Sequence, residues 1–218
     1  MSEEKPRRAD LYLISPLDVG GDFPTRLERA LDAGQVAAFQ FRVKDIDPHE
    51  AARLAEPLQA ICAERDVAFI VNDSISLAKR LGADGVHLGQ GDGEIAEARR
   101  ELGPQAEIGV TCHDSRHLAL EAGEGGADYV AFGAFFPTTT KEVKHQAELA
   151  TLEWWQALFE IPCVAIGGIT PANCGELVLA GADFIAASGA VWNGDEAEAV
   201  KAFNAEIVKA IRSLRSSD

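Results

Sequence analysis

The chain has 218 residues, of which 47% are hydrophobic, and its formal net charge is −15 at pH 7. This length and composition allow a full hydrophobic core in a single domain. The acidic balance argues against nucleic acid or an anionic membrane surface as a partner. It leaves the oligomeric state open, a homo-oligomer included.

The cysteines and the first residues bear on the cellular location. Four cysteines form no CxxC pair and no regular framework, which is typical of reduced thiols in a cytosolic protein. Residues 1–10 are polar and contain no apolar core, so we expect no secretory signal there. The sequence contains no apolar run long enough to cross a bilayer. We therefore expect a cytoplasmic protein with a polar N-terminal segment at residues 1–10.

Short apolar runs recur along the chain, and segments with helical hydrophobic spacing lie between them. The runs predict strands at residues 11–15, 36–43, 67–71, 84–88, 106–110, 128–133, 163–168 and 183–188. Strands that alternate with helices form a parallel sheet, and eight such units in one domain close into a barrel. We therefore predict an α/β fold, a single (β/α)8 TIM barrel over residues 11–218.

The tripeptide Gly-Ala-Asp occurs at residues 82–84, 126–128 and 181–183, each time before an even-numbered strand. Glycine suits the left-handed end of the preceding helix, and the aspartate opens the next strand. These positions fall at the amino-terminal end of the barrel, where residues serve stability. We interpret the repeat as structural.

Polar side chains gather at the carboxyl ends of the predicted strands, which is where barrels of this kind have their active sites. Successive strand side chains point to opposite faces, so Gln40, Arg42 and Lys44 share one face of the second strand. Buried charge is costly unless it is paired, so this face predicts contact with an anion. The polar residues at the ends of the third to sixth strands are Asn72, Asp73, Asp92, Thr111, Thr138, Thr140 and Lys141.

Asp73 and Asp92 follow neighbouring strands at the same rim. Mg²⁺ takes few protein carboxylates and completes its shell with water and substrate phosphates, so the pair predicts a magnesium site. Each has an ordinary alternative: Asp73 as the N-cap of a helix beginning in NDSISLAKR, and Asp92 as a loop aspartate. The cations at the same mouth favour the metal.

Two anion sites are predicted at this mouth. Arg42 offers a planar fork to phosphate, with a salt bridge inside the barrel as its alternative, and Lys44 and Lys141 offer point charges. Gly168 and Ser188 lie in the loops after the seventh and eighth strands, the usual phosphate site of this fold.

The residues after Gly168 predict the start of the seventh helix. We expect Thr170 to be its N-cap and Pro171 to take its first position. Elsewhere, His87 lies inside a strand, which is typical of an interior histidine with satisfied hydrogen bonds. Cys112 and His113 are adjacent in sequence, and adjacency does not indicate a nucleophile–base pair. Two anion sites and a magnesium ion therefore predict chemistry that joins two phosphorylated small molecules.

Taken together, seven motifs resemble those of the thiamine phosphate synthase family, over about residues 11–191. They are QFRVKD, VNDS, GADGVHLGQGD, GVTCH, GADYVAFGAFFPTTTK, VAIGGIT and AGADFIAASGAV. The resemblance implies a TIM-barrel transferase that joins 4-amino-5-hydroxymethyl-2-methylpyrimidine diphosphate to a thiazole phosphate, giving thiamine phosphate and pyrophosphate. It implies a dissociative mechanism in which Mg²⁺ assists the loss of pyrophosphate before the thiazole nitrogen attacks.

The resemblance also implies a role for each matching position. Ligands of the diphosphate or pyrimidine would be Gln40, Arg42, Lys44, Asn72 and Thr111, and ligands of magnesium would be Asp73 and Asp92. The loop over the diphosphate and the incoming thiazole would contribute Thr138, Thr140 and Lys141, and the thiazole phosphate would meet Gly168 and Ser188. Within this set, the resemblance implies catalytic roles for Lys141, Arg42 and Thr111.

The chain departs from the family pattern at three positions. Val43 stands where the family usually has an acidic residue, Gly91 where it usually has glutamate, and Thr111 where it has serine. None of these departures removes a ligand. The alternatives are a thiazole tautomerase on the same barrel and a non-catalytic protein that binds a phosphorylated thiazole. Neither needs the full diphosphate and metal set that this chain keeps.

Overall fold

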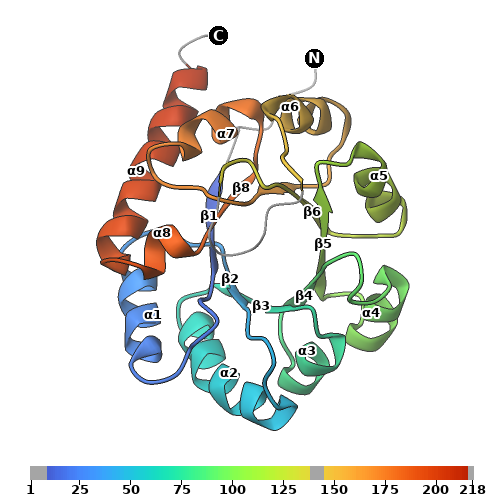
Figure 1. The fold of residues 1–218 in the computed structure, drawn as a ribbon, viewed down its shortest axis with the longest axis vertical. Coiled ribbons are helices and arrows are strands. Elements are labelled where there is room, and N and C mark those ends of the chain that lie inside the picture. The colour runs from blue at the N-terminus through green and yellow to red at the C-terminus, as the bar shows by residue number, and fades with distance from the viewer. Residues whose placement is uncertain (1–8, 138–144, 216–218) are drawn as a thin grey trace.

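The computed structural model describes residues 9–137 and 145–215. Within these ranges the chain forms a ring of eight parallel strands surrounded by helices (Figure 1). Each strand pairs with the next in chain order, and β1 pairs with β8, which closes the ring. The predicted (β/α)8 TIM barrel is confirmed.

The strands and helices alternate along the described chain. The strands are β1 (Asp10–Ile14), β2 (Ala38–Phe41), β3 (Ala68–Asn72), β4 (Gly85–Leu88), β5 (Glu107–His113), β6 (Tyr129–Phe132), β7 (Cys163–Ala165) and β8 (Phe184–Ala187). The helices are α1 (Phe23–Asp32), α2 (Pro48–Ala63), α3 (Ile75–Leu81), α4 (Ile95–Leu102), α5 (Arg116–Glu124), α6 (Leu149–Leu158), α7 (Cys174–Ala180), α8 (Gly189–Trp192) and α9 (Glu196–Arg215). Among these helices, none has both the length and the apolar character needed to cross a membrane.

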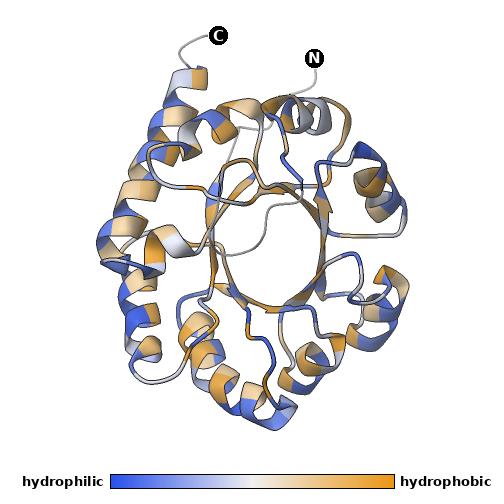
Figure 2. Cartoon of the chain, viewed as in Figure 1, coloured by the Kyte–Doolittle hydropathy of each residue, from blue (hydrophilic) through white to orange (hydrophobic). Residues whose placement is uncertain are grey.

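Apolar side chains pack on both sides of the strands. The colours of Figure 2 show that the strands are mostly hydrophobic in sequence, while hydrophobic and hydrophilic positions alternate along the surrounding helices. On β2, Phe39 and Phe41 face the helices, and each ring centroid lies about 6 Å from that of Phe69. Gln40 alternates with them and faces the inside of the barrel, as predicted. The smaller interior cluster consists of Tyr12, Ala38, Ile70, Tyr129, Ala131, Val164 and Ala186.

The Gly-Ala-Asp repeats join neighbouring strands at the amino-terminal end of the barrel. Gly82 ends α3 with φ of 59°, in the left-handed region that favours glycine. The carboxylate of Asp84 then accepts the backbone N–H of Phe69 in the preceding strand at 2.7 Å. Asp128 and Asp183 accept a bond from the strand before them in the same way, at 2.7 and 2.8 Å. The structural interpretation of the repeat is confirmed.

Some strands are shorter than predicted where the backbone turns at the carboxyl end of the barrel. β7 ends at Ala165 rather than at residue 168, because Gly167 and Gly168 adopt φ of 95° and 65°. β2 ends at Phe41, so Arg42 follows the strand instead of lying within it. These turns direct loop residues toward the mouth of the barrel.

The 20-residue helix α9 joins the two ends of the helical ring. It packs against α7 and α1 and contacts β1. At its start, the buried Glu196 accepts a hydrogen bond from Arg26 of α1 at 3.0 Å. The last helix therefore fastens the last unit of the barrel to the first.

Candidate active site

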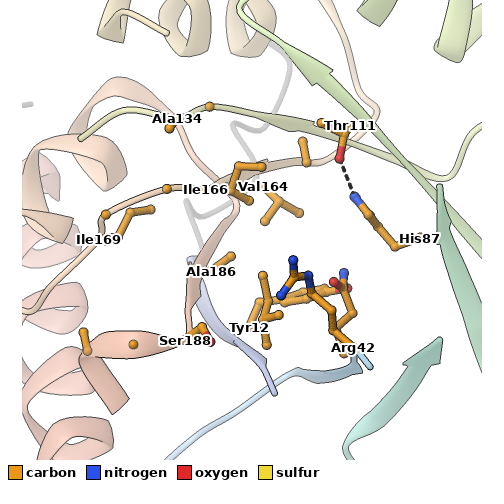
Figure 3. Close-up of a pocket in the computed structure, with 18 of the residues that line it drawn as sticks. Tyr12, Arg42, His87, Thr111, Ala134, Val164, Ile166, Ile169, Ala186 and Ser188 are labelled. Carbon is orange, nitrogen blue, oxygen red and sulfur yellow. Dashed lines mark hydrogen bonds between the residues drawn. The ribbon is translucent and has the colours of Figure 1, made fainter. Parts of the chain in front are cut away.

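A cavity of about 880 Å³ lies at the carboxyl ends of the strands. Every strand, or the loop directly after it, contributes to the wall. The cavity brings together six of the residues predicted from the sequence, namely Gln40, Arg42, Asn72, Thr111, Gly168 and Ser188 (Figure 3). Lys44, Asp73 and Asp92 are not part of this lining and form a neighbouring charged group.

Arg42 provides a cation on the cavity wall. Its backbone N–H donates to the buried hydroxyl of Ser15 at 2.9 Å, which ties the end of β2 to the end of β1. Its Nη1 atom is buried and has no hydrogen-bond partner within residues 9–137 and 145–215. A buried donor on a charged group is costly when it is left unpaired. An interior salt bridge, the alternative considered for Arg42, would have satisfied this atom, so the arrangement favours an anionic ligand.

The acidic pair lies beside this cation. The backbone of Asp73 has φ of 64°, and its N–H donates to the carbonyl of His87 at 2.8 Å. Burial, followed by the hydrogen bond and the charge of Asp92, raises the pKa of the Asp73 carboxyl. Lys44 opposes this effect, with its Nζ atom 3.7 Å from Asp73 Oδ2. Two carboxyl groups held this close favour a cation between them.

The local structure decides between the interpretations of these two aspartates. Ser74, and not Asp73, caps α3, because the Ser74 hydroxyl accepts the N–H of Leu77 at 3.2 Å. The N-cap alternative for Asp73 is therefore wrong. Asp92 does support its loop, since Oδ2 accepts the N–H of Gly89 at 2.9 Å.

The two aspartates offer a donor set that suits some metals and not others. In the described ranges, no cluster of three or more histidine, cysteine, aspartate or glutamate side chains could hold a metal ion. Mg²⁺ commonly uses one or two carboxylates and takes its other ligands from water and substrate phosphates. The pair Asp73 and Asp92 fits that ion, and it does not provide the tetrahedral nitrogen and sulfur set of a zinc site.

A chain of hydrogen bonds crosses the floor of the cavity inside the barrel. Gln40 Nε2 donates to the Tyr12 hydroxyl at 2.9 Å, and the hydroxyls of Tyr12 and Tyr129 lie 3.0 Å apart. His87 Nδ1 is 3.1 Å from the Tyr129 hydroxyl, and His87 Nε2 is 2.8 Å from Thr111 Oγ1 (Figure 3). His87 is thus a hydrogen-bonded interior histidine, as predicted, and it also lines the cavity.

Glycines shape the wall formed by the loop after β7. A Cβ atom on Gly168 would collide with the carbonyl oxygen of Pro137 and would lie 2.7 Å from that of Phe136, so only glycine fits. The side chain of Asn173 holds this loop, donating to the Gly168 carbonyl at 3.2 Å and accepting the Thr170 N–H at 2.8 Å.

The predicted start of the seventh helix is wrong. Asn173, rather than Thr170, occupies the N-cap position, and α7 begins at Cys174. Residues 171–173 form a turn whose bonds return to the Thr170 carbonyl, from the N–H groups of Asn173 and Cys174 at 3.2 and 3.0 Å. Pro171 therefore lies in this turn and not in the helix.

The loop after the neighbouring strand also reaches the cavity. Ser188 follows β8 and lines the cavity together with Gly189.

Comparison with known proteins gives the family. Residues 11–191 match the family model described as thiamine monophosphate synthase. The chain belongs to this family. It is 71% identical over 204 residues to the thiamine-phosphate synthase of Erythrobacter litoralis, covering 92% of this chain and 96% of the relative. It is 56% identical to that of Rhodospirillum centenum, covering 89% and 95% of the two chains.

A solved structure supports the same relationship. The thiamine phosphate pyrophosphorylase from Pyrococcus furiosus superposes with a TM-score of 0.82 at 31% identity, covering 92% of this chain and 96% of that one. The resemblance drawn from the motifs is thereby confirmed.

Three residues to which the thiamine monophosphate synthase resemblance gives roles, Thr138, Thr140 and Lys141, lie outside the described residues. The residues on either side of them are described, and both Pro137 and His145 line the cavity. The segment that carries the three residues therefore starts and ends at the site.

The lining also includes aromatic residues that were not among the predicted site residues, among them Tyr12, Tyr129, His113 and His145. The alternation that places Gln40 inside the barrel also places Tyr129 on the inner face with Ala131, so the sequence held a signal for the tyrosines. The histidines gave no such signal. Their rings stack with centroids 4.7 Å apart, which depends on the return path of a long loop.

Cys112 contributes nothing to this wall. It is fully buried among the apolar residues outside the strands, and burial raises the pKa of its thiol to about 12. A thiol in that state is a poor nucleophile, because the thiolate is the reactive form. The interpretation that Cys112 and His113 are not a nucleophile–base pair is confirmed.

Proposed function

We propose that this protein is a thiamine-phosphate synthase with its active site in the cavity at the carboxyl ends of the strands. It transfers the (4-amino-2-methylpyrimidin-5-yl)methyl group of 4-amino-5-hydroxymethyl-2-methylpyrimidine diphosphate to the nitrogen of a thiazole phosphate: the bond from that methylene carbon to the diphosphate oxygen breaks, a carbon–nitrogen bond forms, and pyrophosphate leaves. The observation that carries this proposal is the buried Arg42 Nη1 atom without a described partner, next to a pair of aspartates. A diphosphate complexed with a divalent cation satisfies both features.

Binding of the diphosphate falls to the wall formed by β2 and β3. Arg42 donates to the phosphate oxygens from its planar fork, and Lys44 adds a point charge. Asn72, at the end of β3, and Gln40, inside the barrel, line the same side of the cavity and contact the diphosphate or the pyrimidine. The cations on this wall attract an anion although the protein as a whole is acidic.

Asp73 and Asp92 would hold Mg²⁺ in this proposal. The raised pKa of Asp73 and the hydrogen bond between the two carboxyl groups support a cation at this position. Such an ion supplies positive charge to the leaving diphosphate. Lys44, which is 3.7 Å from Asp73, can turn between this carboxylate and a phosphate oxygen.

The second substrate occupies the wall formed by the loops after β7 and β8. Gly168 and Ser188 line that wall, and the loops after the seventh and eighth strands are the usual phosphate site of this fold. Arg42 follows β2 and Ser188 follows β8, and both line the cavity (Figure 3). In this proposal the two anions bind apart, with the reacting carbon and nitrogen between them.

The reaction is dissociative, so negative charge grows on the leaving diphosphate before the new bond forms. Fixed cations lower the barrier most where that charge develops, which gives the catalytic roles to Arg42 and Lys141. Thr111 stands on the opposite side of the floor and binds the pyrimidine ring. Thr138 and Thr140, from the same loop as Lys141, complete the cover over the diphosphate and keep water from the pyrimidine cation.

A direct assay tests the proposal. Purified protein is mixed with both phosphorylated substrates, with and without Mg²⁺, and the release of pyrophosphate and the formation of thiamine phosphate are followed. We expect both products in equal amounts only when both substrates and the metal are present. Isomerisation of the thiazole phosphate without pyrophosphate release would instead identify a tautomerase, and binding without any product would identify a binding protein.

A cytoplasmic location completes the proposal. The four buried free cysteines support a reducing compartment.

A further inference from the structure

The polar chain on the floor of the cavity is unusual for its surroundings. Apart from its own members, the interior cluster around it is made of small and aliphatic side chains. Tyr12 and Tyr129 are buried, and a buried hydroxyl must find a partner or destabilise the fold. Phenylalanine at both positions would fill the same volume without this requirement. The hydroxyls therefore have a role beyond filling space.

The two ends of the chain are side chains that face the ligand. Gln40 lies at one end and Thr111 at the other, and both line the cavity. Between them, Tyr12, Tyr129 and His87 come from β1, β6 and β4, so the connection crosses the interior of the barrel.

The direction of the hydrogen bonds follows from which side-chain atoms carry protons. Gln40 Nε2 donates to the Tyr12 oxygen, so the Tyr12 proton is directed to Tyr129. The Tyr129 proton is then directed to His87 Nδ1, which accepts it. A neutral imidazole that accepts at Nδ1 carries its proton on Nε2, and it donates that proton to Thr111 Oγ1.

This direction determines what each end offers to the ligand. Thr111 accepts from His87, so its own proton is available to donate into the cavity. Gln40 donates one of its two side-chain N–H groups to Tyr12, and its carbonyl oxygen is available to accept. One wall then presents an acceptor and the other a donor, which is the complement of an aminopyrimidine, whose amino group donates and whose ring nitrogen accepts.

The packing of Tyr129 holds the middle of the chain in place. A Cβ atom on Gly109 of β5 would collide with the Tyr129 ring, so the ring lies directly against that backbone. On its other side the ring stacks on His87, with the centroids 5.6 Å apart. Burial raises the pKa of Tyr12 to about 12 and that of Tyr129 well above its usual value, so both hydroxyls keep the protons they donate.

We propose that Tyr129 is a positioning residue that holds His87 as its Nε2–H tautomer and thereby makes Thr111 a hydrogen-bond donor to the pyrimidine ring. Tyr12 links this chain to Gln40. The proposal rests on the proposed function, because it names the part of the pyrimidine substrate that the floor of the cavity recognises.

Tyr129→Phe removes the hydroxyl and keeps the ring. We expect the kcat/KM for the pyrimidine diphosphate to fall about 3- to 10-fold, the loss that follows removal of one neutral hydrogen bond. The KM for the thiazole phosphate should stay unchanged. Tyr12→Phe is the matched variant: it also deletes a buried hydroxyl from the chain, but the Tyr129 hydroxyl can still donate to His87.

Nitrogen NMR of the histidines reads the tautomer without any substrate. We expect His87 to be protonated at Nε2 in the native protein and in Tyr12→Phe, and to lose this preference in Tyr129→Phe. A native His87 protonated at Nδ1 would overturn the proposal. A merely structural tyrosine would lower the melting temperature in both variants and leave the tautomer as it was.

A double-mutant cycle with Thr111→Val tests whether Tyr129 acts through Thr111. If it does, Tyr129→Phe adds little further loss once the Thr111 hydroxyl is gone. Losses that multiply in the double variant overturn the proposal. Absence of pyrophosphate release by the native protein would overturn the proposed function instead, and the NMR measurement would still decide the direction of the chain.

Discussion

Arg42 combines a permanent charge with a buried Nη1 atom that meets no acceptor among the described residues. The protein therefore holds this side chain ready for a ligand at some cost to its own stability, and Ser15 fixes the backbone that carries it. We assign this combination to the diphosphate substrate, because in the proposed function the thiazole phosphate binds at Gly168 and Ser188, which also line the cavity.

We predict that Arg42→Ala weakens the binding of the pyrimidine diphosphate roughly 10- to 100-fold, because hydrogen bonds to a charged group contribute about 1.5–3 kcal/mol each. The affinity for the thiazole phosphate should change little. Titration calorimetry with each substrate measures both values. Arg53→Ala, which removes an exposed arginine of α2 paired only locally with Glu50, serves as the control. Equal losses for the two substrates would show that Arg42 has been placed at the wrong anion.

Asp92 gives a second prediction at this scale. A neutral amide is a poorer ligand for a hard cation than a carboxylate, so Asp92→Asn should raise the magnesium concentration needed for half-maximal activity. The expected change is about 10- to 100-fold, the range seen when even an outer partner of a bound metal is removed. Steady-state rates measured at increasing magnesium concentrations give this value. The control is Asp66→Asn, which makes the same replacement at an exposed turn. An unchanged magnesium requirement would contradict the assignment.

The Gly-Ala-Asp repeats join neighbouring strands at the end of the barrel opposite the cavity. The carboxylate of Asp84 accepts the N–H of Phe69, which is 1% exposed and therefore has no access to water as a substitute. Because this bond is remote from the cavity, its loss should affect stability and not chemistry.

We predict that Asp84→Ala lowers the free energy of unfolding by about 1–3 kcal/mol, the penalty for leaving a buried donor unpaired. The kcat and both KM values should be unchanged at a temperature where the variant is folded. Urea unfolding followed by circular dichroism measures the first quantity, and Glu56→Ala, at an exposed position of α2, is the comparison. A stability equal to that of the native protein would mean that the carboxylate makes no net contribution.

How much the sequence could predict differs between the strands and the loops. The apolar runs located all eight strands because burial on both faces of a parallel barrel leaves a strong signal in composition. The ends of the strands were harder to predict. β7 stops at Ala165 because the backbone turns at Gly167 and Gly168, and hydrophobicity does not indicate backbone dihedral angles. Threonine is a favoured N-cap residue, so the sequence predicted that Thr170 caps the helix. Asn173 occupies the N-cap position instead and bonds to Thr170, and α7 begins about one turn later than predicted.

The candidate site shows the same difference. Alternation along β2 was enough to place Gln40 inside the barrel, since strand geometry is regular. The partnership of Tyr12, Tyr129 and His87 depends on the register of three strands that are distant in sequence, so no local pattern contains it. The stacking of His113 on His145 similarly depends on the path of a long loop.

For the molecule as a whole, the four cysteines report on the integrity of the barrel. All of them are buried and free. Burial raises the pKa of Cys62 and Cys112 from 9.0 to about 12, and that of Cys174 to about 11. In the folded state these thiols are therefore protonated, and burial keeps thiol reagents away from them.

We predict that a thiol reagent such as 5,5′-dithiobis(2-nitrobenzoate) labels the native protein at pH 8 only as fast as the barrel opens. A shift of three pKa units lowers the thiolate fraction by about a thousandfold, and burial excludes the reagent as well. In guanidinium chloride, all four thiols should react at once. A single cysteine that reacts within seconds in the native protein would show a local opening near it.

The pairing of β1 with β8 has a consequence for folding during synthesis on the ribosome. Leu11 and Tyr12 can pair with β8 only after Ile185 and Ala186 have been synthesised. Until then, any sheet that the nascent chain forms has two open edges, which are prone to pairing with other chains. Ring closure comes after nearly all of the polypeptide has been made. Molecular chaperones that shield open edges would thus act on this protein late, at the step that also creates its catalytic interior.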